Sequence, residues 1–182
     1  MKCKLISKIR RRLYVKTVVL VYSHEKDTAA TSPVTIAKAD KNSISDVLTF
    51  DTADYLPVYT RFFDEGQTCY LAYLDNRCVH RSWVIDKPQN VHSHWAHSMP
   101  LKENEVFIHY CFTDPKARGK NIFTYVLSEI CREYKNYKAL IAVEGSNKAS
   151  RKSIEKAGFK PFMQIKVLII AGIVFRKKAQ II

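Results

Sequence analysis

The chain has 182 residues, of which 47% are hydrophobic and 26% are charged, which is the composition of one globular domain. Lysine and arginine (30) far outnumber aspartate and glutamate (17), and the formal net charge of +13 predicts an anionic partner. Nucleic acid is not the expected partner, because the sequence contains neither a nucleic-acid recognition motif nor basic residues interleaved with aromatic ones.

The cysteine and apolar patterns indicate the compartment. The five cysteines are scattered and lack CxxC spacing, which predicts buried free thiols in a reducing compartment and excludes a disulfide framework or a zinc site. The longest apolar run, residues 167–175, is about half as long as a bilayer span. We therefore expect a cytoplasmic protein.

The chain begins with a basic segment. Residues 1–16 predict a helix with Leu5, Ile6, Ile9 and Leu13 near one face and cations on the others. Such a helix either anchors the protein to anionic lipid at the inner face of the membrane or packs on the domain through its narrow apolar stripe. The β-rich residues 17–22 predict a strand. Residues 1–30 would thus form a basic arm and strand ahead of a main domain of residues 31–182.

The first half of this domain predicts several short elements. We expect a strand at 34–37, helices at 43–50 and 52–63, strands at 68–74 and 77–85, and a strand at 105–112. Pro57 is expected to interrupt the second helix. Asp75 and Asn76 form a two-residue turn of hairpin type between the two middle strands.

The second half contains the clearest helical pattern. Apolar residues recur at helical spacing over residues 121–134. A short strand at 139–143, a helix at 147–157 ended by Gly158, and one or two strands at 163–175 follow. Strands and helices in this order predict a mixed α+β sheet.

An anion site is predicted where the strand at 105–112 gives way to the next helix. The free N–H groups and the positive dipole end of a helix N-terminus attract an anion, and Lys116, Arg118 and Lys120 add charge. A pyrophosphate suits this site. The loop lacks the glycine patterns of nucleotide P-loops and Rossmann turns, which argues against ATP and NAD.

Two motifs carry a resemblance to a known family. The loop with Arg118, Gly119 and Lys120 resembles the Arg-Gly-x-Gly-x-Gly/Ala pyrophosphate loop of the GNAT superfamily of acyl-CoA-dependent N-acetyltransferases. Asn121 and Phe123 stand where that family usually has small residues. Residues 147–159 are similar to the family's Asn-x-x-Ser/Ala helix that ends in Gly-Phe, and the two motifs occur in the family's order.

The resemblance implies a fold and a coenzyme. The GNAT fold is a mostly antiparallel sheet of about six to seven strands that splays between its fourth and fifth strands and is flanked by helices. Acetyl-CoA would be the acyl donor, and no metal is required. The residues implied to hold the coenzyme are Phe112, Thr113, Arg118, Gly119, Lys120, Asn121, Ile122, Phe123, Asn147 and Ser150.

The resemblance also implies direct transfer of the acetyl group to an amine, helped by positioning, carbonyl polarisation and proton removal. The candidate general bases are Glu144 and His109. Each has an ordinary alternative, as a helix-dipole partner and as a hydrogen-bonded half-buried histidine respectively. Ile154 occupies the position of a tyrosine that often protonates the leaving thiolate in the family, which leaves Ser153, Tyr110 or water for that step.

Residues 91–98 contain three histidines, His92, His94 and His97. No carboxylate or cysteine lies nearby at ligand spacing, so we do not expect a metal site. We expect a loop between the third and fourth strands of the family fold that lines the acceptor pocket. Trp95 and His97 are the candidate substrate contacts, with ordinary packing as the alternative for Trp95.

Three functions remain open. The basic start, GNAT core and basic tail resemble acetyltransferases associated with bacterial surface-polysaccharide synthesis, which suggests a small amine such as an amino sugar as the acceptor. A protein or peptide amine is the second acceptor class. A non-catalytic acyl-CoA-binding or membrane-docking module is the third hypothesis.

Overall fold

A computed structural model describes residues 14–170 and 173–182 of the chain. Most of the expected basic helix lies outside these residues, so its contact with a membrane stays a prediction. Its last three residues correct the expectation, because Tyr14 begins a strand. Pairing with the strand of residues 159–170 overrides the helical pattern at this point. No helix in the described ranges is long and apolar enough to cross a bilayer.

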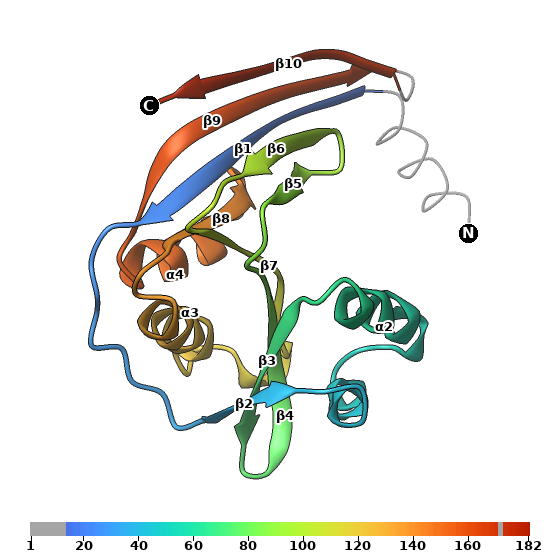
Figure 1. The fold of residues 1–182 in the computed structure, drawn as a ribbon, viewed down its shortest axis with the longest axis vertical. Helices are drawn as coiled ribbons and strands as arrows, with labels where there is room; N and C mark the ends of the chain where they lie inside the picture. Colours follow the sequence, from blue (N-terminus) through green and yellow to red (C-terminus); the bar gives the residue numbers. More distant parts are fainter. Residues whose placement is uncertain (1–13, 171–172) are drawn as a thin grey trace.

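The described residues form one eight-stranded sheet and a separate two-stranded sheet (Figure 1). The large sheet has the order β10-β9-β1-β8-β7-β4-β3-β2, and β5 pairs with β6. Among the described pairs only β7 and β8 are parallel. The strands are β1 Tyr14–His24, β2 Thr35–Ala39, β3 Thr68–Leu74, β4 Arg77–Ile85, β5 Gln89–His94, β6 His97–Leu101, β7 Glu105–Thr113, β8 Lys138–Glu144, β9 Phe159–Ile170 and β10 Ile173–Ile181.

The helices agree in large part with the sequence pattern. They are the 3₁₀ helices η1 Ser43–Thr49, η2 Ala53–Tyr55 and η3 Pro115–Ala117 and the α-helices α2 Leu56–Asp64, α3 Ile122–Glu133 and α4 Lys148–Lys156. Pro57 lies in the first turn of α2, where a missing N–H costs nothing, so it starts the helix and does not interrupt it. The mixed α+β fold with a mostly antiparallel sheet flanked by helices is confirmed.

Two local expectations are also supported. Asp75 and Asn76 adopt positive φ values of 50° and 61°, as a tight hairpin turn requires. The described cysteines all carry free thiols, three of them buried and Cys111 partly exposed.

One expectation is corrected. The small β5–β6 sheet was not predicted as strands, and it replaces the loop expected at residues 91–98.

Strand β1 lies inside the sheet, between β8 and β9 and antiparallel to both. Its side chains alternate between the two faces, so that Val19 and Val21 join one apolar cluster and Leu20 and Tyr22 join another. The N-terminal strand is therefore an integral part of the core.

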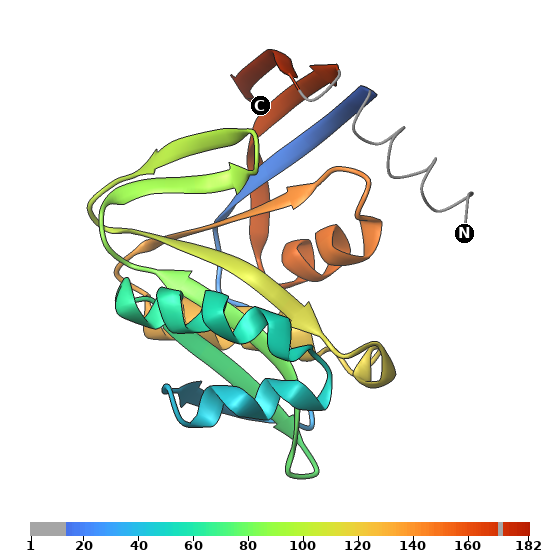
Figure 2. The same ribbon diagram turned by 90° about the vertical axis from the view of Figure 1, so that its right-hand side faces the viewer.

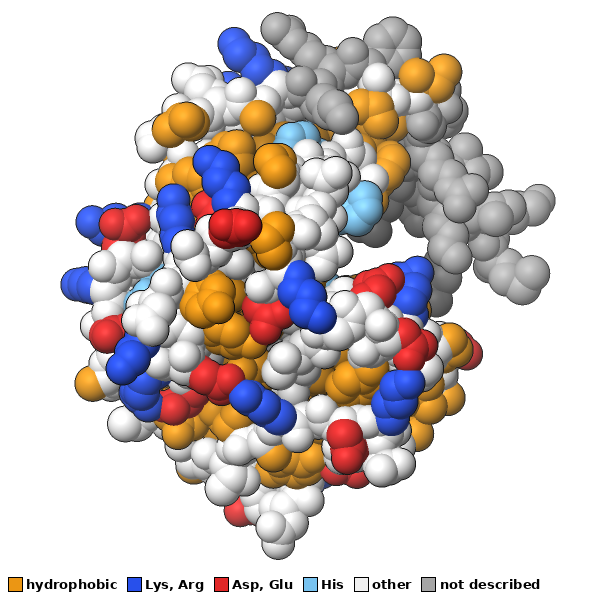
Figure 3. Space-filling model, viewed as in Figure 1, with side chains coloured by type: hydrophobic (Ala, Val, Ile, Leu, Met, Phe, Trp, Pro, Cys, Tyr) orange, Lys and Arg blue, Asp and Glu red, His pale blue; other side chains and the backbone are white. Residues whose placement is uncertain are grey.

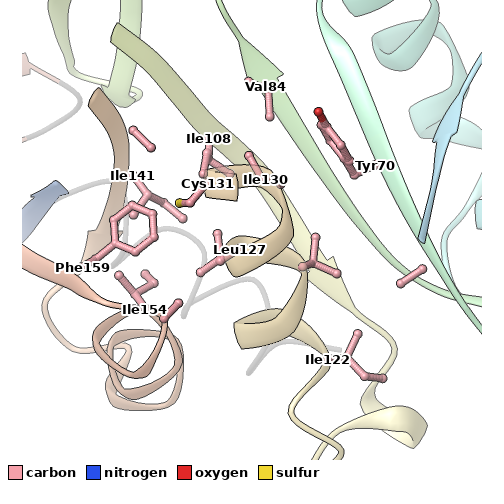
Figure 4. Close-up of a cluster of buried hydrophobic side chains, with 14 of the residues drawn as sticks. Tyr70, Val84, Ile108, Ile122, Leu127, Ile130, Cys131, Ile141, Ile154 and Phe159 are labelled. Atoms are coloured by element: carbon pink, nitrogen blue, oxygen red, sulfur yellow. The ribbon is translucent and has the colours of Figure 1, made fainter. Parts of the chain in front are cut away.

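Helices and the small sheet cover the two faces of the large sheet (Figure 2). Helices α3 and α4 lie on one face, where Leu127 and Ile130 of α3 pack against Ile108 and Ile141 of the sheet (Figure 4). Elements η1, α2 and the β5–β6 hairpin cover the other face through two further apolar clusters.

Strands β7 and β8 are paired over only part of their length. The parallel pairing runs from Glu105 with Lys138 to Ile108 with Ile141. Beyond it, β7 carries a bulge opposite β4, and Tyr110 within this bulge has a φ of 51°. The two strands diverge toward their C-terminal ends, and Figure 2 shows the wedge that opens between them.

Two glycines with similar backbone angles provide a test of this packing. Gly158 (φ 90°) joins α4 to β9, and a Cβ there would lie 2.0 Å from the Lys26 carbonyl oxygen. A Cβ on Gly119 (φ 86°) would meet no atom of the described residues within 4 Å. We expect Gly119→Ala to lower the free energy of unfolding by about 1 kcal/mol, the cost of positive φ alone. Gly158→Ala should cost at least about 3 kcal/mol, because the clash with backbone adds to that strain. Equal costs in urea unfolding would contradict this packing.

Candidate functional site

A cleft of about 910 Å³ occupies the wedge between β7 and β8. Its walls come from both strands, from the loop before α3 and from α4. It brings together all of the predicted coenzyme residues except Lys120, together with both candidate bases, His109 and Glu144. Trp95 and His97 lie outside it, on the β5–β6 hairpin.

The loop before α3, where the sequence predicts a pyrophosphate site, forms one end of the cleft. The first N–H groups of this helix have no partner within it and point toward the loop. Asn121 caps the helix in a left-handed conformation (φ 59°), and its amide is fixed on both sides. Its Nδ2 donates to the Thr31 carbonyl at 3.0 Å, and its Oδ1 accepts from Lys156 Nζ at 3.0 Å. The open space beside Gly119 leaves room for an anion to approach the backbone.

The charge at this end comes from two segments. Arg118 is exposed, and its guanidinium lies 5.8 Å from the centre of the Phe112 ring. Lys152 and Lys156 of α4 also line the cleft. Sequence reasoning did not assign these two lysines to the site, although their i, i+4 spacing after Asn147 places them on one face of the helix.

The opposite wall belongs to α4. Asn147 caps this helix, and its Oδ1 accepts from the Ser150 N–H at 3.1 Å. Phe123 is half-buried against the core, and Ile122 is buried there. Ile154 is 1% exposed and packs in the same core, so its position offers the cleft no ionisable group.

A buried histidine on β4, His80, which sequence reasoning missed, is hydrogen-bonded to the end of β7. His80 is fully buried, with Nδ1 2.6 Å from Thr113 Oγ1 and Nε2 2.8 Å from Ser82 Oγ. Burial, together with the nearby Arg81 charge, lowers the pKa of His80 to about 3. The imidazole therefore stays neutral and fixes the side chain of Thr113 at the cleft.

The candidate base His109 lies on β7, half-buried, on the face covered by α2. Its Nε2 is 2.8 Å from Gln67 Oε1, and Gln67 donates through its own amide nitrogen to Glu65. This arrangement assigns the proton of neutral His109 to Nε2 and leaves the lone pair on Nδ1. Burial first, and then the Arg81 charge, lower the pKa of His109 to about 4. His109 is thus neutral at pH 7 but only weakly basic.

The other candidate base, Glu144, ends β8 and is exposed at the cleft. Burial lowers the pKa of His94 on the hairpin, and the Glu144 charge opposes this shift. Next to His94, Trp95 is 65% exposed, and its ring centre is 5.4 Å from that of His94. His97 Nδ1 lies 2.8 Å from Ser93 Oγ.

The hairpin and α2 lie on the same face of the large sheet, and the hairpin is the segment predicted to contact the acceptor. Figure 3 shows that the surface is hollowed between them, with a histidine on its hairpin side. Within residues 14–170 and 173–182, no group of three or more His, Cys, Asp or Glu side chains is arranged to hold a metal ion.

Comparisons of the sequence and of the fold with known proteins both lead to one family. A family model described as "Acetyltransferase (GNAT) family" matches residues 42–159. No curated protein sequence matches the chain significantly.

Three solved structures illustrate the likeness in fold. A GNAT-family acetyltransferase from Colwellia psychrerythraea superposes with a TM-score of 0.63 at 14% identity over 86% of this chain, which spans 56% of that protein. A glucosamine N-acetyltransferase region of a fungal multi-domain β-N-acetylglucosaminidase gives 0.61 at 13% identity, over 91% of this chain and 22% of that one. An aminoglycoside 6′-N-acetyltransferase from Acinetobacter baumannii superposes with a TM-score of 0.52 at 16% identity, and the match covers 70% of this chain and 90% of that protein.

The neutral state of His80 predicts a dependence of stability on pH. Near pH 6.5 the unfolded chain takes up a proton on this side chain, whereas the folded protein does so only near pH 3. The unfolded state therefore binds more protons in between, and the free energy of unfolding falls as the pH drops. From pH 7.5 to 5.5 we expect His80 to account for about 1 kcal/mol of this loss. Urea unfolding of wild type and His80→Gln at both pH values checks this, and an unchanged pH dependence in the variant would refute it.

Proposed function

Since this chain belongs to the GNAT acetyltransferase family and is an acyltransferase, we propose that it transfers the acetyl group of acetyl-CoA to the primary amine of a small molecule. The observation that carries the proposal is the convergence of an anion site and a strand wedge in one cleft. One end offers helix N–H groups and cations, and the middle offers the free backbone edges of β7 and β8.

The residues present suit the coenzyme. The open space at Gly119 and the unpaired amides of the first turn of α3 fit a pyrophosphate, with Arg118, Lys120, Asn121, Ile122 and Phe123 around it. Lys152 and Lys156 add charge that suits a further phosphate group. Phe112, Thr113, Asn147 and Ser150 would hold the pantetheine arm along the wedge. When bound, acetyl-CoA supplies the activated acetyl thioester.

The backbone of β7 would polarise the acyl carbonyl. Beyond Ile108 this strand no longer pairs with β8, so its N–H and C=O groups on that side are available to a ligand. Donors fixed in a strand stabilise developing negative charge without reorganising. Phe112 and Thr113 lie at this position, and the His80–Thr113 hydrogen bond keeps the segment in place.

Glu144 is the better of the two candidate bases. His109 is half-buried on the face covered by α2, and its Nε2–H is engaged by Gln67, so it is poorly placed to meet a substrate amine. Glu144 is exposed at the end of β8 on the cleft, where a carboxylate can attract an ammonium group and take its proton through water. For the leaving thiolate, Ser153 and Tyr110 line the cleft and water has access, whereas Ile154 has no proton to give.

The acceptor we propose is an amino sugar. Trp95 and Tyr110 expose aromatic surface on which a sugar ring can stack, and His94 and Glu144 add polar groups. His97 would support the hairpin that carries Trp95. Two proteins that share this fold are named for acetylation of glucosamine and of an aminoglycoside, so the fold admits acceptors of this chemistry.

Titration calorimetry tests the coenzyme site. We expect micromolar binding of acetyl-CoA by the wild type and a loss of about tenfold or more in Arg118→Ala/Lys152→Ala, because two cations that line the cleft are removed. Lys102→Ala/Lys135→Ala removes the same charge from exposed positions away from the cleft and should bind like wild type. Absence of binding at millimolar acetyl-CoA would reject the coenzyme assignment and leave the fold with another role.

An acceptor panel tests the reaction. Product masses should reveal acetylated amino sugars and no acetylated peptides, and acetylation of peptides alone would reverse the choice of acceptor. At pH 7, Glu144→Gln should lower kcat by roughly 100-fold or more with little change in the KM for acetyl-CoA, because a general base contributes on this scale. His109→Gln serves as the paired variant, and a larger loss of kcat there would transfer the role to His109. Coenzyme binding without turnover on any amine would favour a binding module.

A further inference from the structure

A buried arginine outside the predicted site contacts the bulge of β7. Arg81 lies on β4, and its side chain is 7% exposed. The strand register pairs Arg81 with Phe112 and Trp83 with His109, which leaves two residues of β7, Tyr110 and Cys111, opposite the single residue between Arg81 and Trp83. Arg81 is therefore positioned beside the irregularity that opens the wedge.

The guanidinium holds the bulge directly. Its Nη1 donates to the carbonyl oxygen of Tyr110, the residue with positive φ. The Arg81 Cζ atom lies 4.8 Å from the Tyr110 ring centre and 5.6 Å from the Phe112 ring centre. A tyrosine in left-handed conformation is strained, and such strain persists only where surrounding contacts fix it. Arg81 provides a polar contact of this kind.

A second buried charge fixes Arg81 itself. Its Nε is 2.9 Å from Asp51 Oδ2, and the Asp51 side chain is 10% exposed. The same carboxylate oxygen accepts from the Tyr59 hydroxyl at 2.5 Å, and Oδ1 accepts from the Thr52 N–H at 3.0 Å. Although burial disfavours its charge, these hydrogen bonds from Tyr59 and Arg81 keep the pKa of Asp51 below its usual range.

We propose that Arg81, oriented by Asp51, is a positioning residue that holds the β7 bulge in the conformation that presents Phe112 and Thr113 to the acyl end of the coenzyme. This inference rests on the proposed function and deepens it. Arg81 links Asp51 and Tyr59, on the face of the sheet covered by η1 and α2, to the β7 backbone that is proposed to polarise the carbonyl.

Stability alone does not account for a buried ion pair at this position. Replacing such a pair by apolar residues of similar volume is often neutral or stabilising, because both charges are removed from water in the folded state. Removal of one partner is costly, since it leaves a buried charge unpaired. Exchange of both residues therefore gives a variant that keeps a packed core but lacks the contact with Tyr110.

The experiment compares Asp51→Leu/Arg81→Met with wild type and with Lys41→Met/Asp64→Leu. The control removes an exposed ion pair (2.5 Å) between the segments that carry η1 and α2, on the same face of the sheet. Arg81→Lys is the second test variant. It retains the charge next to Asp51 but has no guanidinium fork to reach Asp51 and Tyr110 together.

The first readout compares kcat/KM for acetyl-CoA with the Kd for CoA, which carries no acetyl group. Both test variants should lose at least about tenfold in kcat/KM for acetyl-CoA. Their Kd for CoA, which the phosphate end determines, should change less than about threefold, and the control should match wild type in both values. Wild-type kcat/KM in the test variants would overturn the proposal, as would an equal loss of CoA affinity, since that indicates general damage to the cleft.

The second readout does not depend on activity. Amide hydrogen exchange by NMR should be faster at Tyr110, Cys111 and Phe112 in the test variants and unchanged in the α3 core. If the wild type fails to bind acetyl-CoA, the proposed function falls, but this measurement still tests the contact. Unchanged exchange at these three amides would overturn the role of Arg81.

Discussion

The site depends on one constraint, the interruption of pairing between β7 and β8. Backbone N–H and C=O groups in the middle of a sheet normally have partners, and strands that separate there leave those groups to water or to a ligand. The pairing stops at Ile108 and Ile141, and the capping residues of α3 and α4, Asn121 and Asn147, lie on the same cleft. Two strand edges and the N-terminus of α3 thus direct unpaired donors and acceptors into a single volume, and the start of α4 lies on the same cleft.

The local parts of this arrangement could be predicted from the sequence. The 3.6-residue period of α3, the Asp75–Asn76 turn and the cation-rich loop before α3 are encoded by neighbouring residues, and each is found where it was expected. Helix capping by Asn147 is similarly local. The predicted coenzyme residues other than Lys120 fall on one cleft because the two motifs flank the strands that form it.

The missed features are those set by distant parts of the chain. Nothing in β1 itself indicates that it lies between β8 and β9, because both partners follow it by more than 100 residues. The β5–β6 hairpin contributes only a few inward apolar residues, Val91, Met99 and Leu101, too few for a strong strand pattern. The Arg81–Asp51 pair spans 30 residues and two different elements, so it has no sequence signature. These contacts are long-range packing, which local propensity does not record.

The burial of His80 and His109 gives the cleft an ordered distribution of charge. Both imidazoles are kept neutral by burial, with Arg81 reinforcing the effect, so the middle of the cleft gains no positive charge at neutral pH. The cations that line the cleft are then Arg118, Lys152 and Lys156, while Glu144 contributes a carboxylate at the C-terminal end of β8. A polyanionic donor and a cationic amine would be attracted to different groups of such a cleft. The same burial that keeps His109 neutral thereby leaves the exposed carboxylate of Glu144 as the charged group that would meet the cationic amine.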